Sequence, residues 1–153
     1  MLTALSGTIL TVLTGTLIYV SGQVIVKLVI DPVQELKKTI GQISHSLVEL
    51  ANVIANPGVP KEEVISDASK QLRNLSSQLH GHLYLIPKYS ITTRIFKLPK
   101  KNELLEASDS LRSLSNSLYD ARNEKVYEHN AKQVEKICKA LSIYMPESSK
   151  RLK

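Results

Sequence analysis

Two arginine–histidine pairs in this sequence have a spacing that could support chemistry at a phosphate group. Arg122 precedes His129, and Arg73 precedes His80, each time as Arg-Asn followed by five residues and His. A guanidinium presents planar donors to a phosphate, and an imidazole exchanges protons near neutral pH. The chain has no Gly-rich phosphate loop and no Cys/His cluster, so we predict neither a cofactor nor a metal site.

An internal repeat in the sequence distinguishes the two arginine–histidine pairs. The repeated segments are ASKQLRNLSSQL at 68–79 and ASDSLRSLSNSL at 107–118. Arg73 recurs as Arg112, whereas the position of His80 is taken by Tyr119. The repeated feature is therefore an arginine beside core leucines, and we interpret Arg73 as a residue of helix packing or of an inter-helix ion pair. The candidate catalytic residues are therefore Arg122 and His129, which lie outside the repeat.

Apolar residues recur at helical spacing through most of the chain after residue 31. The spacing predicts helices at about 32–55, 60–80, 101–118 and 123–142, and no stretch is rich in strand signals. Repeat units 60–79 and 99–118 would form two matching helices. We predict an all-α fold in which an antiparallel bundle of about four helices occupies residues 31–146, followed by a basic tail at 147–153.

The first 30 residues predict a transmembrane helix. No charged residue occurs before Lys27, and the apolar run from Ala4 to Val26 exceeds the roughly 20 residues that cross a bilayer. Because Lys27, Lys37 and Lys38 follow this run, the positive-inside rule places the C-terminal part in the cytoplasm. A single cysteine, Cys138, fits a reducing compartment. The alternative is a buried helix of a soluble protein.

Small residues share one face of this helix, and they suggest self-association. The four oligomerisation candidates are Gly7, Thr11, Gly15 and Gly22. Small residues four positions apart allow helices to approach closely in lipid. Their hydroxyl groups could instead line a polar path in a ring of protomers. The remaining alternative is that the composition has no such role.

The segment between the two repeats, residues 80–101, is basic and contains no acid. Its basic residues are Lys88, Arg94, Lys97, Lys100 and Lys101, with aromatic and aliphatic residues interleaved. This composition suits a membrane surface, while RNA would use the same charges with aromatic stacking. The third alternative is a loop that folds back over the core.

The segments GQVIVKLVIDPVQELKKTIGQIS, LVELANVIANPG and EASDSLRSLSNSL carry a resemblance to known proteins. Together they resemble a family of small, largely uncharacterised bacterial proteins with one N-terminal span and a helical cytoplasmic domain. The Arg-Asn-x5-His pattern resembles the motif of the helical HEPN RNases. In layout the chain is similar to the pore-forming membrane accessory proteins of type VI-B CRISPR systems, with Arg122 and His129 at the matching positions.

The functional expectation is a protein of the bacterial inner membrane that acts through assembly or partner interaction. The resemblance extends this expectation to a pore or an antiviral defence effector. Expected partners are membrane lipid, further copies of the chain and an unidentified protein. The alternative is a membrane-tethered, metal-independent HEPN-like RNase or an RNA-binding domain. A net charge of +6 is compatible with either, although nucleic acid is the less favoured partner.

Overall fold

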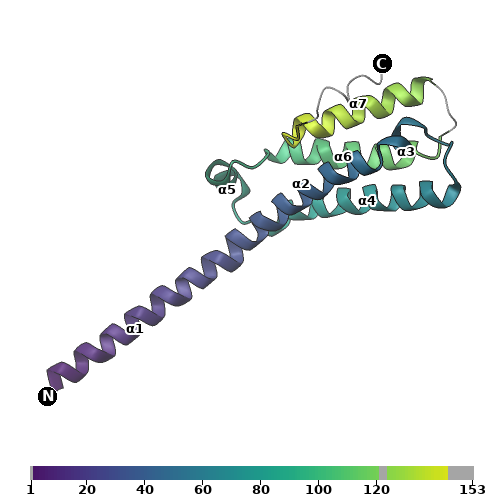
Figure 1. Cartoon of the computed structure of the whole chain (residues 1–153). Coiled ribbons are helices and arrows are strands. Elements are labelled where there is room, and N and C mark those ends of the chain that lie inside the picture. Colours follow the sequence, from purple (N-terminus) through teal and green to yellow (C-terminus); the bar gives the residue numbers. More distant parts are fainter. Residues whose placement is uncertain (1, 121–123, 145–153) are drawn as a thin grey trace.

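The computed structural model describes residues 2–120 and 124–144, and it describes side chains from Gly7 onward. Within these residues the fold is all-α, without strands, as predicted (Figure 1). The elements are α1 (Leu2–Ile25), the π-helix η1 (Val26–Ile30), α2 (Asp31–Glu49), α3 (Ala51–Ala55), α4 (Glu62–Leu85), α5 (Tyr89–Phe96), α6 (Lys101–Ser117) and α7 (Glu124–Ala140).

The helices α1, η1 and α2 follow one another without a loop and form one long helix. The wider π turn lies directly before Pro32, and in it the Asp31 amide donates to the carbonyl of Val26. Proline has no N–H, and its ring would clash with the carbonyl four residues earlier in a regular α-helix. A local π turn is one way for a helix to accommodate such a residue.

Asp31 does not cap the start of a new helix, although Asp before Pro is typical of a helix start. The residue before it, Ile30, is already helical, and no side chain caps α2. The Asp31 carboxylate instead accepts a hydrogen bond from Lys27 Nζ at 3.0 Å, one turn earlier. A continuing helix satisfies the backbone groups that a cap would otherwise serve.

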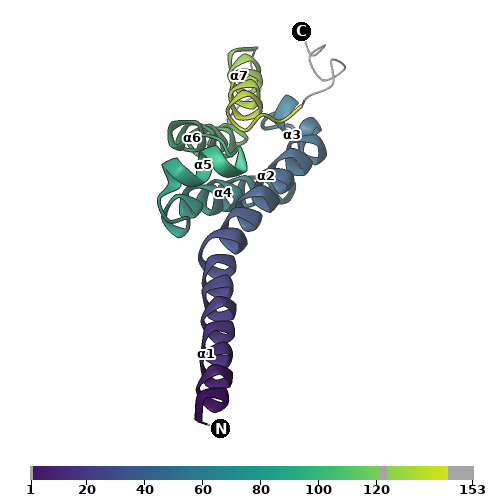
Figure 2. The ribbon, with the colours of Figure 1, turned by 90° about the vertical axis from the view of Figure 1, so that its left-hand side faces the viewer.

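The bundle consists of α2, α4, α6 and α7, with α3 closing against α7. Helix α4 packs between α2 and α6, and α6 packs between α4 and α7. Figure 2 shows this bundle at one end of the long helix, with α1 extending beyond it. The predicted apolar stripes of the two repeats are buried in full, and they comprise Ile65, Ala68, Leu72, Leu75, Leu79, Leu104, Ala107, Leu111, Leu114 and Leu118.

The two repeat helices, α4 and α6, are joined by a pair of buried serines. Ser76 Oγ donates to the carbonyl of Ser108 at 2.8 Å, and Ser108 Oγ donates to the carbonyl of Ser76 at 3.0 Å. Small side chains at this point allow the backbones to come close enough for both bonds. The repeat therefore corresponds to a helix pair whose contact is built from small polar residues as well as leucines.

Helix α4 continues past Gly81, where its end was predicted, to Leu85. Gly81 keeps helical geometry, and a glycine inside a helix costs only about 1 kcal/mol. The helix ends because Ile86 precedes Pro87 and is extended, as residues before proline tend to be. The predicted loop at 80–101 thus contains the last turn of α4 and the helix α5.

Candidate functional site

His129 lies on the surface of α7, facing α6. Its Nε2 atom is 2.9 Å from Ser113 Oγ on α6 and 3.5 Å from Gln133 Nε2 on its own helix. The side chain is exposed, so it is accessible to a ligand. Arg122, its predicted partner, lies outside the described residues. The catalytic pair therefore stays a prediction.

Arg73 joins α4 to α6, which agrees with the packing role that the repeat suggested. Its Nη2 donates to Asn116 Oδ1 at 2.8 Å, so the contact is an inter-helix hydrogen bond and not an ion pair. Its repeat counterpart, Arg112, bonds Asp109 at 2.7 Å within its own helix. His80 stacks on Tyr84, with ring centroids 5.7 Å apart. These contacts leave Arg73 and His80 engaged with different neighbours.

Helix α1 presents its small residues to the outside. A Cβ atom added at Gly7, Gly15 or Gly22 would meet nothing within 4 Å. The Thr11 hydroxyl donates to the Gly7 carbonyl at 2.9 Å, and the Thr14 hydroxyl donates to the Leu10 carbonyl at 2.8 Å. These two hydroxyls are therefore hydrogen-bonded inside the helix and need no further partner in an apolar environment.

Helix α5 is anchored to the bundle by one face. Its inner residues Tyr89 and Phe96 pack against the core, and Thr92 is buried. Tyr89 Oη donates to the Pro99 carbonyl at 2.7 Å, and burial raises the pKa of this phenol to about 12. Thr92 Oγ1 donates to the Pro87 carbonyl at 3.0 Å. These contacts fix which side of α5 faces outward.

The outward side carries a mixed apolar and basic surface, which we call the α5 surface. Its exposed residues are Tyr84, Leu85, Lys88, Ile91, Arg94, Ile95, Lys97, Lys100 and Lys101. Ile95 is 68% exposed and Leu85 is 62% exposed, so large apolar side chains lie in solvent on this surface. The predicted set of five basic residues is thus gathered at one end of the bundle, around exposed aliphatic groups.

A small cleft adjoins the α5 surface. Its volume is about 190 Å³. The charged residues that line it are Lys37 of α2, Lys97 directly after α5, and Glu103 of α6. The Glu103 carboxylate also accepts the Lys100 amide at 2.5 Å, which caps the start of α6. One oxygen of the Glu103 carboxylate is therefore already occupied by a backbone hydrogen bond.

Two buried polar side chains were not predicted. His82 Nε2 lies 2.9 Å from Thr39 Oγ1 of α2, and burial lowers the pKa of this imidazole, an effect that Glu35 partly opposes. Asn130 of α7 donates to the Ile54 carbonyl of α3 at 3.0 Å. Asn130 lies four and seven residues before two inward residues of α7, so the helical spacing could have indicated its burial.

Within the described chain, no three His, Cys, Asp or Glu side chains gather where they could hold a metal ion. His80 and His82, which are close in sequence, point to different surroundings: His82 is buried against α2 and His80 is exposed. Cys138 is buried, and burial raises the pKa of its thiol to about 11, so it is a weak nucleophile at neutral pH.

Helix α1 is long and apolar enough to cross a membrane, and it lies near the N-terminus. No protein-family model, curated protein or solved structure matches this chain.

Proposed function

We propose that this chain is a single-pass membrane protein of the bacterial inner membrane that self-associates and presents its helical bundle to the cytoplasm. The observation that carries the proposal is the exposed apolar surface of α1. Every side chain from Gly7 to Leu28 is exposed, although most of them are apolar. So large an apolar surface is unfavourable in water and favourable in lipid.

The orientation follows from the charges beside this helix. Residues 1–26 carry none, whereas Lys27 comes directly after them and Lys37 and Lys38 follow ten and eleven residues later. Basic residues near a span favour the cytoplasmic side. The bundle would then act in the cytoplasm through assembly or through a protein partner, including assembly into a pore or a defence complex.

Self-association is supported by the open small-residue face at Gly7, Thr11, Gly15 and Gly22. Replacing Gly15 by Ile adds a branched side chain where two helices would approach most closely. We expect Gly15→Ile to reduce crosslinked oligomers in native membranes at least tenfold, which corresponds to about 1.4 kcal/mol of association free energy. Leu13→Ile, on the opposite face, is the matched control and should leave the oligomers unchanged.

The outcome that contradicts self-association is a monomeric crosslinking pattern in the unaltered chain, or equal oligomer yields in both variants. Membrane insertion is tested separately by extraction at alkaline pH, which should leave both variants in the membrane fraction.

The alternative function is a membrane-tethered HEPN-like RNase that uses Arg122 and His129. It is favoured by the exposure of His129 on the bundle surface. We expect His129→Ala to abolish RNA cleavage if this alternative holds and to leave crosslinked oligomers intact. Ser113→Ala removes the hydroxyl beside the imidazole and is a milder control. An unchanged RNA level with both variants excludes the RNase.

A further inference from the structure

We propose that the α5 surface docks onto the anionic phospholipid headgroups of the leaflet that α1 enters, so that the bundle lies on the membrane in a fixed orientation. The inference rests on the proposed function, since it requires α1 to span the bilayer. It adds a second, peripheral contact with a defined lipid chemistry.

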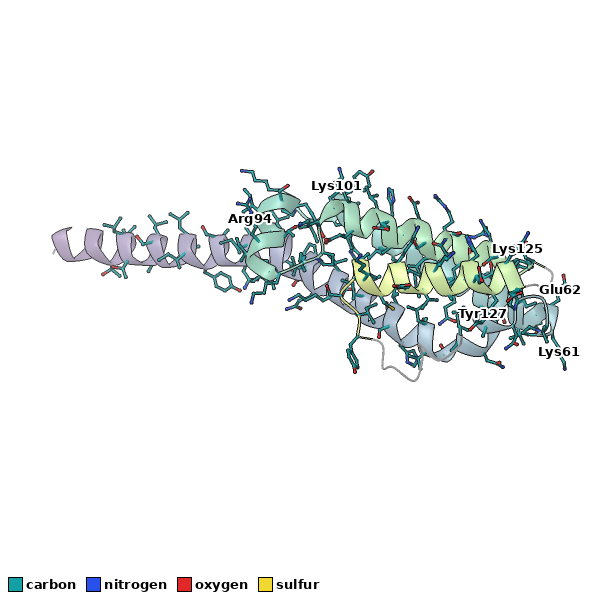
Figure 3. The ribbon with its side chains drawn as sticks, turned by 90° about the horizontal axis from the view of Figure 1, so that it is seen from above. Lys61, Glu62, Arg94, Lys101, Lys125 and Tyr127 are labelled. Carbon is teal, nitrogen blue, oxygen red and sulfur yellow. The ribbon has the colours of Figure 1, made fainter. Side chains whose placement is uncertain are left out.

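The position of α5 places it within reach of the membrane. Figures 1 and 3 show α5, with Arg94 labelled, at the end of the bundle from which α1 leaves, while Lys61 and Lys125 lie at the opposite end. Lys97, directly after α5, lines the same cleft as Lys37 of α2. Ten residues of helix separate Lys37 from Lys27, which is about 15 Å at 1.5 Å per residue. A modest tilt of the long helix brings α5 to the headgroup layer.

The charges of this surface are available to a ligand. None of its five basic side chains forms an ion pair with another described residue. By contrast, Lys27 and Lys38 on the long helix are each within 4.0 Å of a carboxylate. Basic residues beside exposed aliphatic groups are the composition of a peripheral membrane contact.

The backbone conformation at both ends of α5 supports a functional role for the lysine charges there. Lys88 (φ 45°) and Lys97 (φ 51°) have left-handed conformations, which glycine or asparagine adopts at lower cost. Neither lysine forms an ion pair with a described residue that would account for its presence at these positions. An observed strained residue at a surface is a reason to look for a function there.

The exposed apolar groups favour lipid over RNA. Binding of single-stranded RNA depends on aromatic rings that stack on bases. On α5 the two aromatic residues, Tyr89 and Phe96, pack against the core, and the outward groups are Ile91 and Ile95. Tyr84 is then the one exposed aromatic ring of the α5 surface, among three exposed aliphatic side chains, Leu85, Ile91 and Ile95. Aliphatic side chains insert into the acyl boundary but offer no stacking surface.

The test uses the full chain, reconstituted into vesicles of phosphatidylcholine alone or of equal parts phosphatidylcholine and phosphatidylglycerol. A fluorophore is attached at Ile95→Cys, and nitroxide groups on the lipid acyl chains act as the quencher. The native thiol of Cys138 is buried with a raised pKa and reacts slowly, so it can remain in place. Probes at Ile18→Cys on α1 and Tyr119→Cys at the far end serve as references.

We expect the probe at position 95 to be quenched in phosphatidylglycerol vesicles and only weakly in phosphatidylcholine alone. The double variant Lys88→Gly, Lys97→Gly removes two charges while relieving both strained backbone positions, so it should fold as well as the parent. Its ratio of docked to undocked chains should fall about 30-fold. The control Lys61→Gln, Lys125→Gln changes the net charge equally and should behave like the parent.

Three results overturn the inference, and they differ from one another. If position 18 is quenched and position 95 is not, α1 spans the membrane and docking is wrong. If neither is quenched, the proposed membrane insertion itself fails. If added single-stranded RNA shields position 95 from a water-soluble quencher while anionic lipid has no effect, the surface binds nucleic acid instead.

Discussion

His82 is held between α4 and α2 by one hydrogen bond to Thr39, and its Nδ1 atom has no partner among the described residues. A protonated imidazole in this position would carry a charge that lacks a second acceptor. Burial therefore keeps the pKa of the ring below its ordinary value of 6.5, and Glu35 acts in the opposite direction.

The stability of the bundle should consequently decrease in mild acid. Below about pH 6.5 the unfolded chain binds a proton at His82 that the folded chain does not, so unfolding takes up a proton. The free energy of unfolding falls as the pH drops through this range, by at most about 1.4 kcal/mol per pH unit, and levels off once the folded form is protonated. Thermal unfolding in detergent between pH 7.5 and pH 5 measures the effect.

The variant His82→Gln should weaken this pH dependence, because glutamine can still bond Thr39 but does not titrate. His45→Gln, on an exposed histidine of α2, is the control and should preserve it. Equal pH profiles for the parent and His82→Gln would contradict the assignment of the effect to His82.

Asn130 joins three helices through its amide. Its Nδ2 donates to the Ile54 carbonyl of α3, and its Oδ1 accepts from Ser117 Oγ of α6 at 2.5 Å. Asn130→Leu leaves the Ile54 carbonyl without its partner, and we expect a loss of about 1–3 kcal/mol in the free energy of unfolding. Denaturant titration measures it. Asn74→Leu, at an exposed position, should change stability far less.

At the scale of the element, the contact between α4 and α6 depends on small residues at the crossing point. Ser76→Leu would force the two backbones apart and break both serine bonds, so we expect a loss of about 1–3 kcal/mol or more. The neighbouring Ser77 is exposed, and Ser77→Leu introduces the same side chain without overpacking. If the two variants unfold at the same denaturant concentration, the serine contact does not control the helix spacing.

The leucine stripes of these elements were predictable because their spacing alone determines which face is buried. Helix ends were less predictable: Gly81 resembled a terminator, but His82 and Leu83 after it pack against the bundle, and α4 continues to Leu85. Helix α5 was missed because it is short and its inner residues include Thr92, whose burial depends on a bond to Pro87. The partners of His82 and Asn130 lie on distant segments, and periodicity does not identify such partners.

At the scale of the whole molecule, the long helix joins α1 to the bundle without a loop. The turn at Val26–Ile30 encloses one residue more than an α-helical turn, since Asp31 bonds to the carbonyl five residues earlier. Deleting Val29 would convert this bond into an ordinary α-helical one and leave the two helices in nearly the same relative orientation. Inserting one alanine after Leu28 would rotate the bundle by about 100° relative to α1.

The rotation leaves the height of α5 above the bilayer nearly unchanged, but it alters the direction in which the bundle lies relative to the small-residue face of α1. We therefore expect the deletion to preserve and the insertion to change which bundle positions crosslink between chains that associate through this face, while both keep the probe at position 18 in the bilayer. Identical behaviour of the two length variants would show that the junction bends freely and that the coupling does not exist.

The absence of a loop between α1 and α2 also has an evolutionary consequence. A flexible tether tolerates gain or loss of residues. In a helical junction, each added residue rotates the bundle about the helix axis and changes its height above the bilayer. Substitutions that keep the junction helical change neither quantity. Among natural variants of this chain, the number of residues between Gly22 and Pro32 should accordingly vary less than their identity.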